Sequence, residues 1–221
     1  MAAAIAFFDV DETLISLKSM FDFYDYFLAA MGHSPAEQQR LQGEARALLR
    51  PGLPREQGNR LFYGRFSGYK VAETAAIGRE WFDERLSEGR LFHLDVLDAL
   101  RQHKRTGREV VLLSGSFPAC LDPVAQHCDA DQLRSTRLES DDGVYTGQVL
   151  QTMIGSAKED VARDMISDRD VPAAECYAYG DHVSDLGLLR LVGHPVAVGN
   201  NPHVIEEAEA NCWGRLPGRV R

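Results

Sequence analysis

The sequence predicts an α/β protein built on a doubly wound parallel sheet, Rossmann-like in layout, with an inserted bundle of helices. Short apolar runs that end in polar residues have the length and composition of buried parallel strands. They occupy residues 4–8, 109–113, 176–181 and 195–199. Helical patterns separate these runs, and such alternation is typical of a doubly wound sheet. Residues 17–93 carry helical patterns alone, so we expect a core formed by residues 1–16 and 94–221 and a helical cap formed by residues 17–93.

The predicted cap begins with a helix rich in aromatic residues. Apolar side chains recur every three or four residues from Leu17 to Met31, and Gly32 follows as a stop signal. Ser34, Pro35 and Glu37 have the spacing of a capping box with proline at the first helical position, which predicts a second helix reaching about residue 50. After two prolines, further helical patterns cover residues 55–67 and 71–88.

The predicted core continues after the cap with alternating elements. Its helices are expected at 94–105, 118–128 and 156–167, near 184, and from 202. Asp142 and Gly143 predict the turn of a hairpin over residues 137–149. Ser156 and Glu159 predict a second capping box, which places Lys158 at the second helical position.

Composition narrows the classes of function. The net charge of −9 argues against nucleic-acid binding, which needs a basic surface. No apolar run is long enough for a membrane helix, and the N-terminal apolar stretch is too short for a signal peptide. The four cysteines lack the spacing of a zinc site. We therefore expect a cytoplasmic protein that acts on a small molecule, of unknown oligomeric state.

Polar residues follow three of the predicted strands. Asp9 and Asp11 follow the first, Ser114 the second, and Asp181 the third, with Asp185 four residues later. In open α/β sheets, ligands bind at this edge, where the carboxyl ends of parallel strands meet. Lys158 adds a cation, one of only four lysines beside 20 arginines. In the first turn of a helix a cation is unfavourable, which suggests that an anion lies nearby.

This set of side chains has the chemistry of a phosphoryl-transfer site. Several carboxylates tolerate one another only when a cation neutralises them. Oxygen ligands without Cys or His favour Mg²⁺. Lys158 and Ser114 are then available for the remaining phosphate oxygens, in a site that works by positioning and charge neutralisation.

Four segments carry a resemblance to a known family. DVDETL (9–14), LLSGSF (112–117), KE (158–159) and GDHVSD (180–185) resemble, in order and spacing, the four motifs of the haloacid dehalogenase superfamily. Within it, the chain is most similar to the phosphoserine-phosphatase-like branch, subfamily IB, and the segment DGVYTG (142–147) resembles a hairpin of that branch. The helical stretch lies where the family carries its C1-type cap, so the resemblance spans roughly the whole chain and implies a catalytic core with a cap.

The resemblance implies a role for each motif residue. Asp9 is expected to attack phosphorus and form an aspartyl-phosphate, and Asp11 to act as general acid and then as general base. Ser114 and the Gly115 N–H are expected to bind the phosphate, together with Lys158. The resemblance also implies that Asp9, Asp181 and the Asp11 backbone carbonyl bind Mg²⁺. Thr13 is expected to order the loop, and Asp185 to act through water or by orienting Lys158.

The predicted cap departs from phosphoserine phosphatases at the positions expected to contact the leaving group. Their acidic residue that pairs with the substrate amine corresponds to Lys18, and their cap arginine to Phe62. A lysine in place of an acid inverts the charge preference. We therefore expect a small phosphorylated metabolite other than phosphoserine, anionic or sugar-like, selected by Lys18, Met20 and Phe21.

Other functions share these motifs. A phosphotransferase or phosphomutase would use the same aspartyl-phosphate chemistry with a different acceptor. A non-catalytic phospho-acceptor or binding module is possible on the same fold, although Asp11 and the helical stretch argue against it. Dehalogenation needs neither Mg²⁺ nor the second aspartate and is disfavoured. His182, between two motif residues, faces either substrate or solvent.

Overall fold

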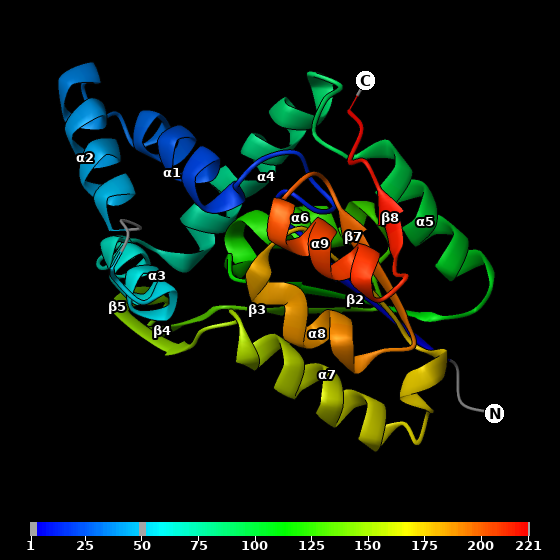
Figure 1. The fold of residues 1–221 in the computed structure, drawn as a ribbon. Helices are drawn as coiled ribbons and strands as arrows, with labels where there is room; N and C mark the ends of the chain where they lie inside the picture. Colours follow the sequence, from blue (N-terminus) through cyan, green and yellow to red (C-terminus); the bar gives the residue numbers. More distant parts are fainter. Residues whose placement is uncertain (1–3, 49–51, 221) are drawn as a thin grey trace.

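The computed structural model describes residues 4–48 and 52–220, and its centre is a parallel sheet of six strands (Figure 1). The strand order is β3-β2-β1-β6-β7-β8, and every neighbouring pair is parallel. The strands are β1 (Ile5–Asp9), β2 (Glu109–Ser114), β3 (Gln132–Ser135), β6 (Tyr177–Gly180), β7 (His194–Val198) and β8 (Gly214–Leu216). The predicted doubly wound fold is confirmed.

The register of the central strands brings the predicted site residues to one edge. Asp9 pairs with Leu113 of β2, and Phe8 pairs with Tyr179 of β6. Each of these strands therefore ends at nearly the same level. Because the polar residues follow directly after the apolar runs, Asp9, Ser114 and Asp181 meet at the carboxyl edge of the sheet.

Two apolar clusters cover the two faces of the sheet, as expected for strands whose side chains alternate between faces. Phe8, Val110 and Leu112 belong to one cluster, and Phe7 and Val111 to the other. The first face packs against α5 (Leu94–Arg105) and α6 (Pro118–His127). The helices over the second face are α7 (Ser156–Asp168), α8 (Leu186–Leu191) and α9 (Pro202–Ala210).

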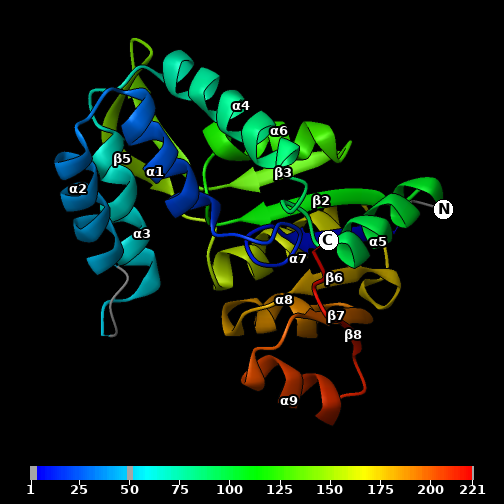
Figure 2. The ribbon, with the colours of Figure 1, turned by 90° about the horizontal axis from the view of Figure 1, so that it is seen from above.

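The segment between β1 and α5 is helical; its first three helices stand to one side of the sheet and its last helix runs back over α6 (Figures 1 and 2). Its helices are α1 (Ser19–Ala30), α2 (Pro35–Ala47), α3 (Arg55–Tyr63) and α4 (Val71–Ser87), with a 3₁₀ turn over Gly64–Phe66. Aromatic rings fill its interior, and Phe117, which follows β2, joins them 4.8 Å from the ring centroid of Phe66. The division of the chain into core and cap stays a prediction.

Helix α4 lies directly on α6. A β-carbon added at Gly78 would stand 1.8 Å from the Ala119 carbonyl oxygen, so only glycine allows this approach. The hairpin of β4 (Arg137–Asp141) and β5 (Val144–Gln151) also reaches the helical segment. The Tyr145 N–H of the hairpin donates to the Tyr69 carbonyl at 3.0 Å, and the Tyr145 carbonyl accepts from the Gly68 N–H at 2.8 Å. Its turn residues Asp142 and Gly143 both have positive φ, as the sequence predicts for this hairpin.

Several predicted boundaries differ from the structure. The capping box at Ser34 is confirmed, whereas the predicted end of that helix near residue 50 lies outside the described residues. The capping box at Ser156 is wrong: Gly155, at φ 59°, is the N-cap, Ser156 begins the helix, and Lys158 is its third residue. Strands β3 and β8 were not predicted, since these short outer strands lack an apolar run.

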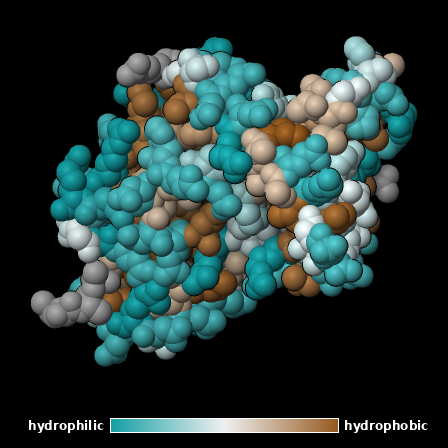
Figure 3. Space-filling model, turned by 180° about the vertical axis from the view of Figure 1, so that it is seen from behind, coloured by the Kyte–Doolittle hydropathy of each residue, from teal (hydrophilic) through white to brown (hydrophobic). Residues whose placement is uncertain are grey.

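The surface carries mostly polar side chains. Figure 3 shows a face on which hydrophilic residues predominate and apolar residues form small separate groups. Within residues 4–48 and 52–220, the helices are all too short or too polar to cross a lipid bilayer.

Candidate active site

A cavity opens at the carboxyl edge of the sheet. It collects residues from β1, β2, α7 and the loop after β6, together with residues of α1 and α3. Its lining residues are Asp9, Asp11, Glu12, Lys18, Met20, Arg55, Asn59, Ser114, Gly115, Ile154, Lys158, Asp181, His182, Ser184 and Asp185. The structure thus brings together all the predicted catalytic, phosphate-binding and metal-binding residues.

Lys158 lies at the centre of the cavity floor, between two buried carboxylates. Its Nζ donates to Asp9 Oδ1 at 2.5 Å and to Asp185 Oδ1 at 2.7 Å. Lys158 is 4% exposed, and Asp9 and Asp185 are 6% and 1% exposed. Burial disfavours the ammonium, but the carboxylates of Asp185 and Asp9 outweigh this effect and raise the pKa of Lys158. A lysine in the first turn of α7 is therefore stabilised by these anions.

Asp9 ends β1 and is held on both oxygens. Its second oxygen accepts from the Thr13 hydroxyl at 3.1 Å, and the same hydroxyl lies 3.0 Å from Asp181 Oδ1. Burial, only partly offset by Lys158, raises the pKa of Asp9 well above its usual range. Burial and the charge of Asp185 likewise raise the pKa of Asp181 to about 6. Burial is the main cause of both shifts, and the charges of neighbouring carboxylates add to it.

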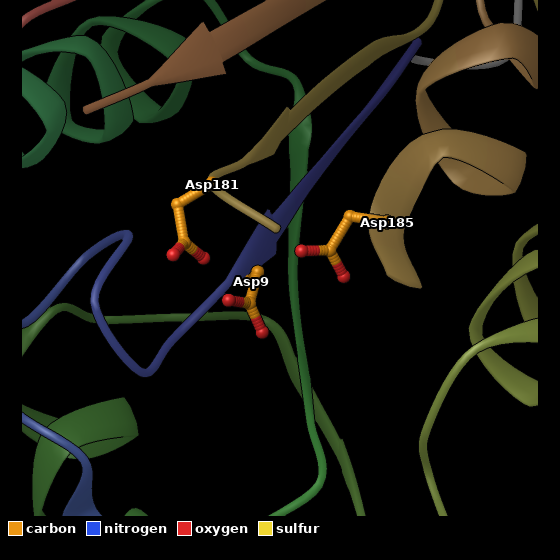
Figure 4. A group of neighbouring side chains, drawn as sticks. All are labelled: Asp9, Asp181 and Asp185. Atoms are coloured by element: carbon orange, nitrogen blue, oxygen red, sulfur yellow. The ribbon is translucent and has the colours of Figure 1, made fainter. Parts of the chain in front are cut away.

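Three carboxylates form a cluster that suits a divalent cation. Asp9, Asp181 and Asp185 point toward one another in Figure 4, and one oxygen of each lies within 4.8 Å of the others. When all three are ionised, these carboxylates and the single ammonium of Lys158 have a formal net charge of −2. An all-oxygen donor set is the kind that Mg²⁺ prefers. Asp185, predicted to act indirectly, is thus close enough to belong to the same cluster.

Asp11 follows β1 in a tight turn. The Val10 carbonyl accepts from the N–H groups of Leu14 and Ile15 at 2.9 Å each, and Glu12 has a positive φ of 61°. The Asp11 carboxylate accepts from the hydroxyls of Ser19 at 2.6 Å and Ser116 at 3.0 Å. Burial raises the pKa of Asp11, and these two hydrogen bonds oppose the shift. A raised pKa suits a group that must donate a proton near neutral pH.

Ser114 and Gly115 form the wall next to Lys158. Ser114 is buried, and its hydroxyl accepts from the Ser116 N–H at 3.1 Å. The Gly115 carbonyl accepts from Asn59 Nδ2 and from Thr136 Oγ1, each at 2.8 Å. A β-carbon at Gly115 would meet Ile154 Cγ1 at 2.8 Å. Side chains of α3 and of the segment after β3 therefore both hold this loop. The space between Gly115 and Ile154 is too small for a β-carbon unless Ile154 moves.

The side of the cavity that faces the helical segment is more exposed. Lys18 pairs with Glu12 at 3.1 Å, and the two side chains are 52% and 46% exposed. Arg55, at the start of α3, donates to His182 Nδ1 at 2.5 Å and to Ser184 Oγ at 3.3 Å, and the same Nδ1 accepts from the Ser184 N–H at 3.0 Å. Burial and the charge of Arg55 lower the pKa of His182, so the imidazole is a neutral acceptor.

Of the three predicted specificity residues, the structure places two in the cavity lining and one outside it. Lys18 and Met20 line the cavity, whereas Phe21 packs edge-to-face on Phe62, with ring centroids 5.5 Å apart. Successive residues of a helix differ by about 100° in direction, so Phe21 turns away when Met20 faces the cavity. Arg55 and Asn59, which also line the cavity, were not predicted.

Comparisons with known proteins agree with this geometry. The family model for haloacid dehalogenase-like hydrolases matches residues 6–190. A protein of Mycobacterium tuberculosis named as a probable phosphatase is 28% identical over 215 residues, covering 96% of this chain and 74% of its own. A Bordetella pertussis protein of unknown function has a TM-score of 0.86 at 24% identity, covering 98% of this chain and 99% of its own. A phosphoserine phosphatase, solved as a phospho-aspartyl intermediate analogue, has a TM-score of 0.68 at 16% identity, covering 100% and 96%.

Proposed function

Because the chain belongs to the haloacid dehalogenase-like hydrolase family, whose model matches residues 6–190, we propose that it is a Mg²⁺-dependent phosphatase of small phosphomonoesters. The observation that carries this proposal is the position of Asp9. It ends a buried strand in contact with Lys158, in a cluster with Asp181 and Asp185, two residues before a second carboxylate.

In the first step, a carboxylate oxygen of Asp9 attacks phosphorus. The new O–P bond forms as the bond from phosphorus to the leaving oxygen breaks, which gives an aspartyl-phosphate. Asp11 donates its proton to the leaving oxygen, so the alcohol departs neutral. The raised pKa of Asp11 supports this role.

In the second step, Asp11 accepts a proton from water. The water oxygen bonds to phosphorus, the bond between phosphorus and Asp9 breaks, and phosphate leaves with both aspartates restored to their starting states. Ser114 and Lys158 hold phosphate oxygens through both steps. The ammonium of Lys158 opposes the charge that develops on them, which is the main way in which such sites lower a barrier.

A magnesium ion fits the carboxylate cluster. Asp9 and Asp181 would hold it, with the Asp11 backbone carbonyl, and Asp185 is close enough to assist. When bound, the ion neutralises charge on the carboxylates and on the phosphate. The net charge of −2 left by three carboxylates and Lys158 supports a divalent cation.

The exposed side of the cavity supports an anionic or polar leaving group rather than phosphoserine. Lys18 and Arg55 are both cationic and line the same cavity. Within the described residues no carboxylate lies within ion-pairing distance of Arg55. A phosphomonoester with a second negative group would meet the guanidinium of Arg55, whereas Lys18 is already paired with Glu12, which lines the same cavity.

The test is phosphate release from a broad panel of phosphomonoesters, with Mg²⁺ and with EDTA. Wild type should release phosphate only with Mg²⁺, and Asp9→Asn should release none. Asp160→Asn, which changes an exposed carboxylate of α7, serves as the matched control and should retain full activity. Transfer of phosphate to an added alcohol in place of water would identify a phosphotransferase. Absence of release from every substrate would contradict the proposal.

A further inference from the structure

The carboxylate of Asp11 is clamped by two hydroxyl groups. Ser19 Oγ donates to Asp11 Oδ1 at 2.6 Å, and Ser116 Oγ donates to Asp11 Oδ2 at 3.0 Å. The two serines come from distant parts of the chain, since Ser19 begins α1 and Ser116 lies in the loop after β2. Each carboxylate oxygen therefore has its own donor, one from the helical segment and one from the sheet.

Both hydroxyls are deeply buried. Ser19 is 0% exposed and Ser116 is 1% exposed. Their oxygens lie within hydrogen-bond distance of each other, at 2.7 Å, and Cys120 Sγ lies 3.8 Å from Ser19 Oγ. The two hydroxyls and the Asp11 carboxyl group therefore form one buried hydrogen-bonded cluster, in which Asp11 is the charged acceptor.

We propose that Ser19 and Ser116 are positioning residues that fix the plane of the Asp11 carboxyl group for proton transfer to the leaving oxygen. This inference rests on the proposed phosphatase function. Two donors, one to each oxygen, leave the carboxyl group no freedom to rotate about its Cβ–Cγ bond. Each oxygen keeps a second lone-pair direction, and Asp11 is one of the residues that line the cavity.

The clamp also links the general acid to the helical segment. Ser19 is the first residue of α1, directly before Met20, which lines the cavity. A shift of α1 would therefore move a donor of Asp11 together with the wall that meets the leaving group. Misplacement of a catalytic group by about 1 Å costs on the order of 100-fold in rate.

The inference has a kinetic signature that a purely structural role lacks. A leaving group that is stable as an anion needs little help from a general acid, whereas a poor leaving group needs the proton. Loss of positioning should therefore slow poor leaving groups selectively. The parameter to measure is kcat/KM, because it reports the steps up to the first departure of the leaving group and excludes hydrolysis of the aspartyl-phosphate.

The experiment uses substituted phenyl phosphates whose leaving phenols differ in acidity, with Mg²⁺. Ser19→Ala and Ser116→Ala should each lower kcat/KM for phenyl phosphate by roughly 10- to 100-fold, and for p-nitrophenyl phosphate by less than about 3-fold. Ser135→Ala, which removes a buried hydroxyl of β3 that does not line the cavity, is the control and should leave the dependence on leaving group unchanged.

A second measurement places Ser19→Ala in an Asp11→Asn background. Because Ser19 acts through Asp11, the second substitution should add no further loss for any member of the series. An equal loss for all leaving groups, or a further loss in the Asp11→Asn background, would overturn the inference. If Ser19→Ala fails to fold, the same two measurements on Ser116→Ala test the inference. Absence of turnover by wild type would instead contradict the phosphatase function itself.

Discussion

The floor of the cavity and the wall that faces the helical segment differ in construction. On the floor, Asp9, Lys158 and Asp185 are at most 6% exposed and are joined by hydrogen bonds of 2.5 and 2.7 Å. On the wall, Lys18 is half exposed and Arg55 is held by the neutral His182. Backbone topology fixes the floor, whereas the two cations of the wall, Lys18 and Arg55, are exposed side chains. We infer that the floor residues perform the reaction. Substitutions in the wall can then change which substrate the protein accepts, at little cost in its free energy of unfolding.

The largest effect should come from breaking the buried ion pairs of the floor. Lys158→Ala leaves Asp9 and Asp185 buried without their cation, which should lower the free energy of unfolding by about 3–5 kcal/mol. Lys18→Ala on the wall should cost less than about 1 kcal/mol, because its partner Glu12 is exposed. Urea unfolding in EDTA measures both. Equal losses would remove the distinction between the two regions.

The second prediction concerns the stabilisation that Mg²⁺ gives when it binds the carboxylates of the floor. A ligand bound only by the native state at 100 times its dissociation constant adds about 2.7 kcal/mol of stability. Mg²⁺ should therefore raise the melting temperature of wild type, and Asp181→Asn should abolish most of this rise. Asp160→Asn, on the exposed face of α7, should retain it. A rise of equal size in Asp181→Asn would exclude Asp181 as a ligand.

A smaller effect should test the wall. Arg55→Ala should lower kcat/KM about 10-fold for phosphomonoesters that carry a second anionic group, and should change it little for neutral ones, as expected for about 1.4 kcal/mol of lost attraction. Arg60→Ala is the matched control, because Arg60 lies on the same helix but contacts Glu56 and the Val149 carbonyl. If both variants behave alike, Arg55 does not select the substrate.

A further effect, present only without metal, is a dependence of stability on pH. The pKa of Asp181 is raised from 3.8 to about 6, so the native state binds this proton more tightly than the unfolded state. Burial of the charged carboxylate therefore lowers stability above about pH 6, and this cost is relieved as the pH falls toward about 4. In EDTA, Asp181→Asn should be more stable than wild type by up to about 3 kcal/mol at about pH 7, and by less than about 1 kcal/mol at about pH 4. A constant difference would contradict the shifted pKa.

The sequence was most informative where a residue's position follows from the end of a strand. Asp9, Ser114 and Asp181 could be grouped because parallel strands end at one edge, and Lys158 because a cation in a first helical turn needs an anion. Arg55 could not be found in this way. It meets His182 across 127 positions of the chain, and that contact depends on how α3 is placed beside the sheet.

Local details were harder to predict for a similar reason. The spacing of Ser156 and Glu159 fits a capping box, but the left-handed conformation of Gly155 starts the helix one residue earlier than such a box would. Met20 and Phe21 are equally apolar, and only the rotation of α1 decides which one faces the cavity. The serines that hold Asp11 had no signal in the sequence, because their partner is set by tertiary contacts.

The central claim is that Asp9 carries the phosphoryl group, and the most direct measurement is to trap it there. Protein mixed with substrate and Mg²⁺ is quenched in acid within one turnover and reduced with borohydride, which converts an aspartyl-phosphate to homoserine. Mass spectrometry of the peptide containing β1 should find homoserine at position 9. An unmodified Asp9 in protein that releases phosphate, or modification at Asp11 or Asp181 instead, would contradict the account.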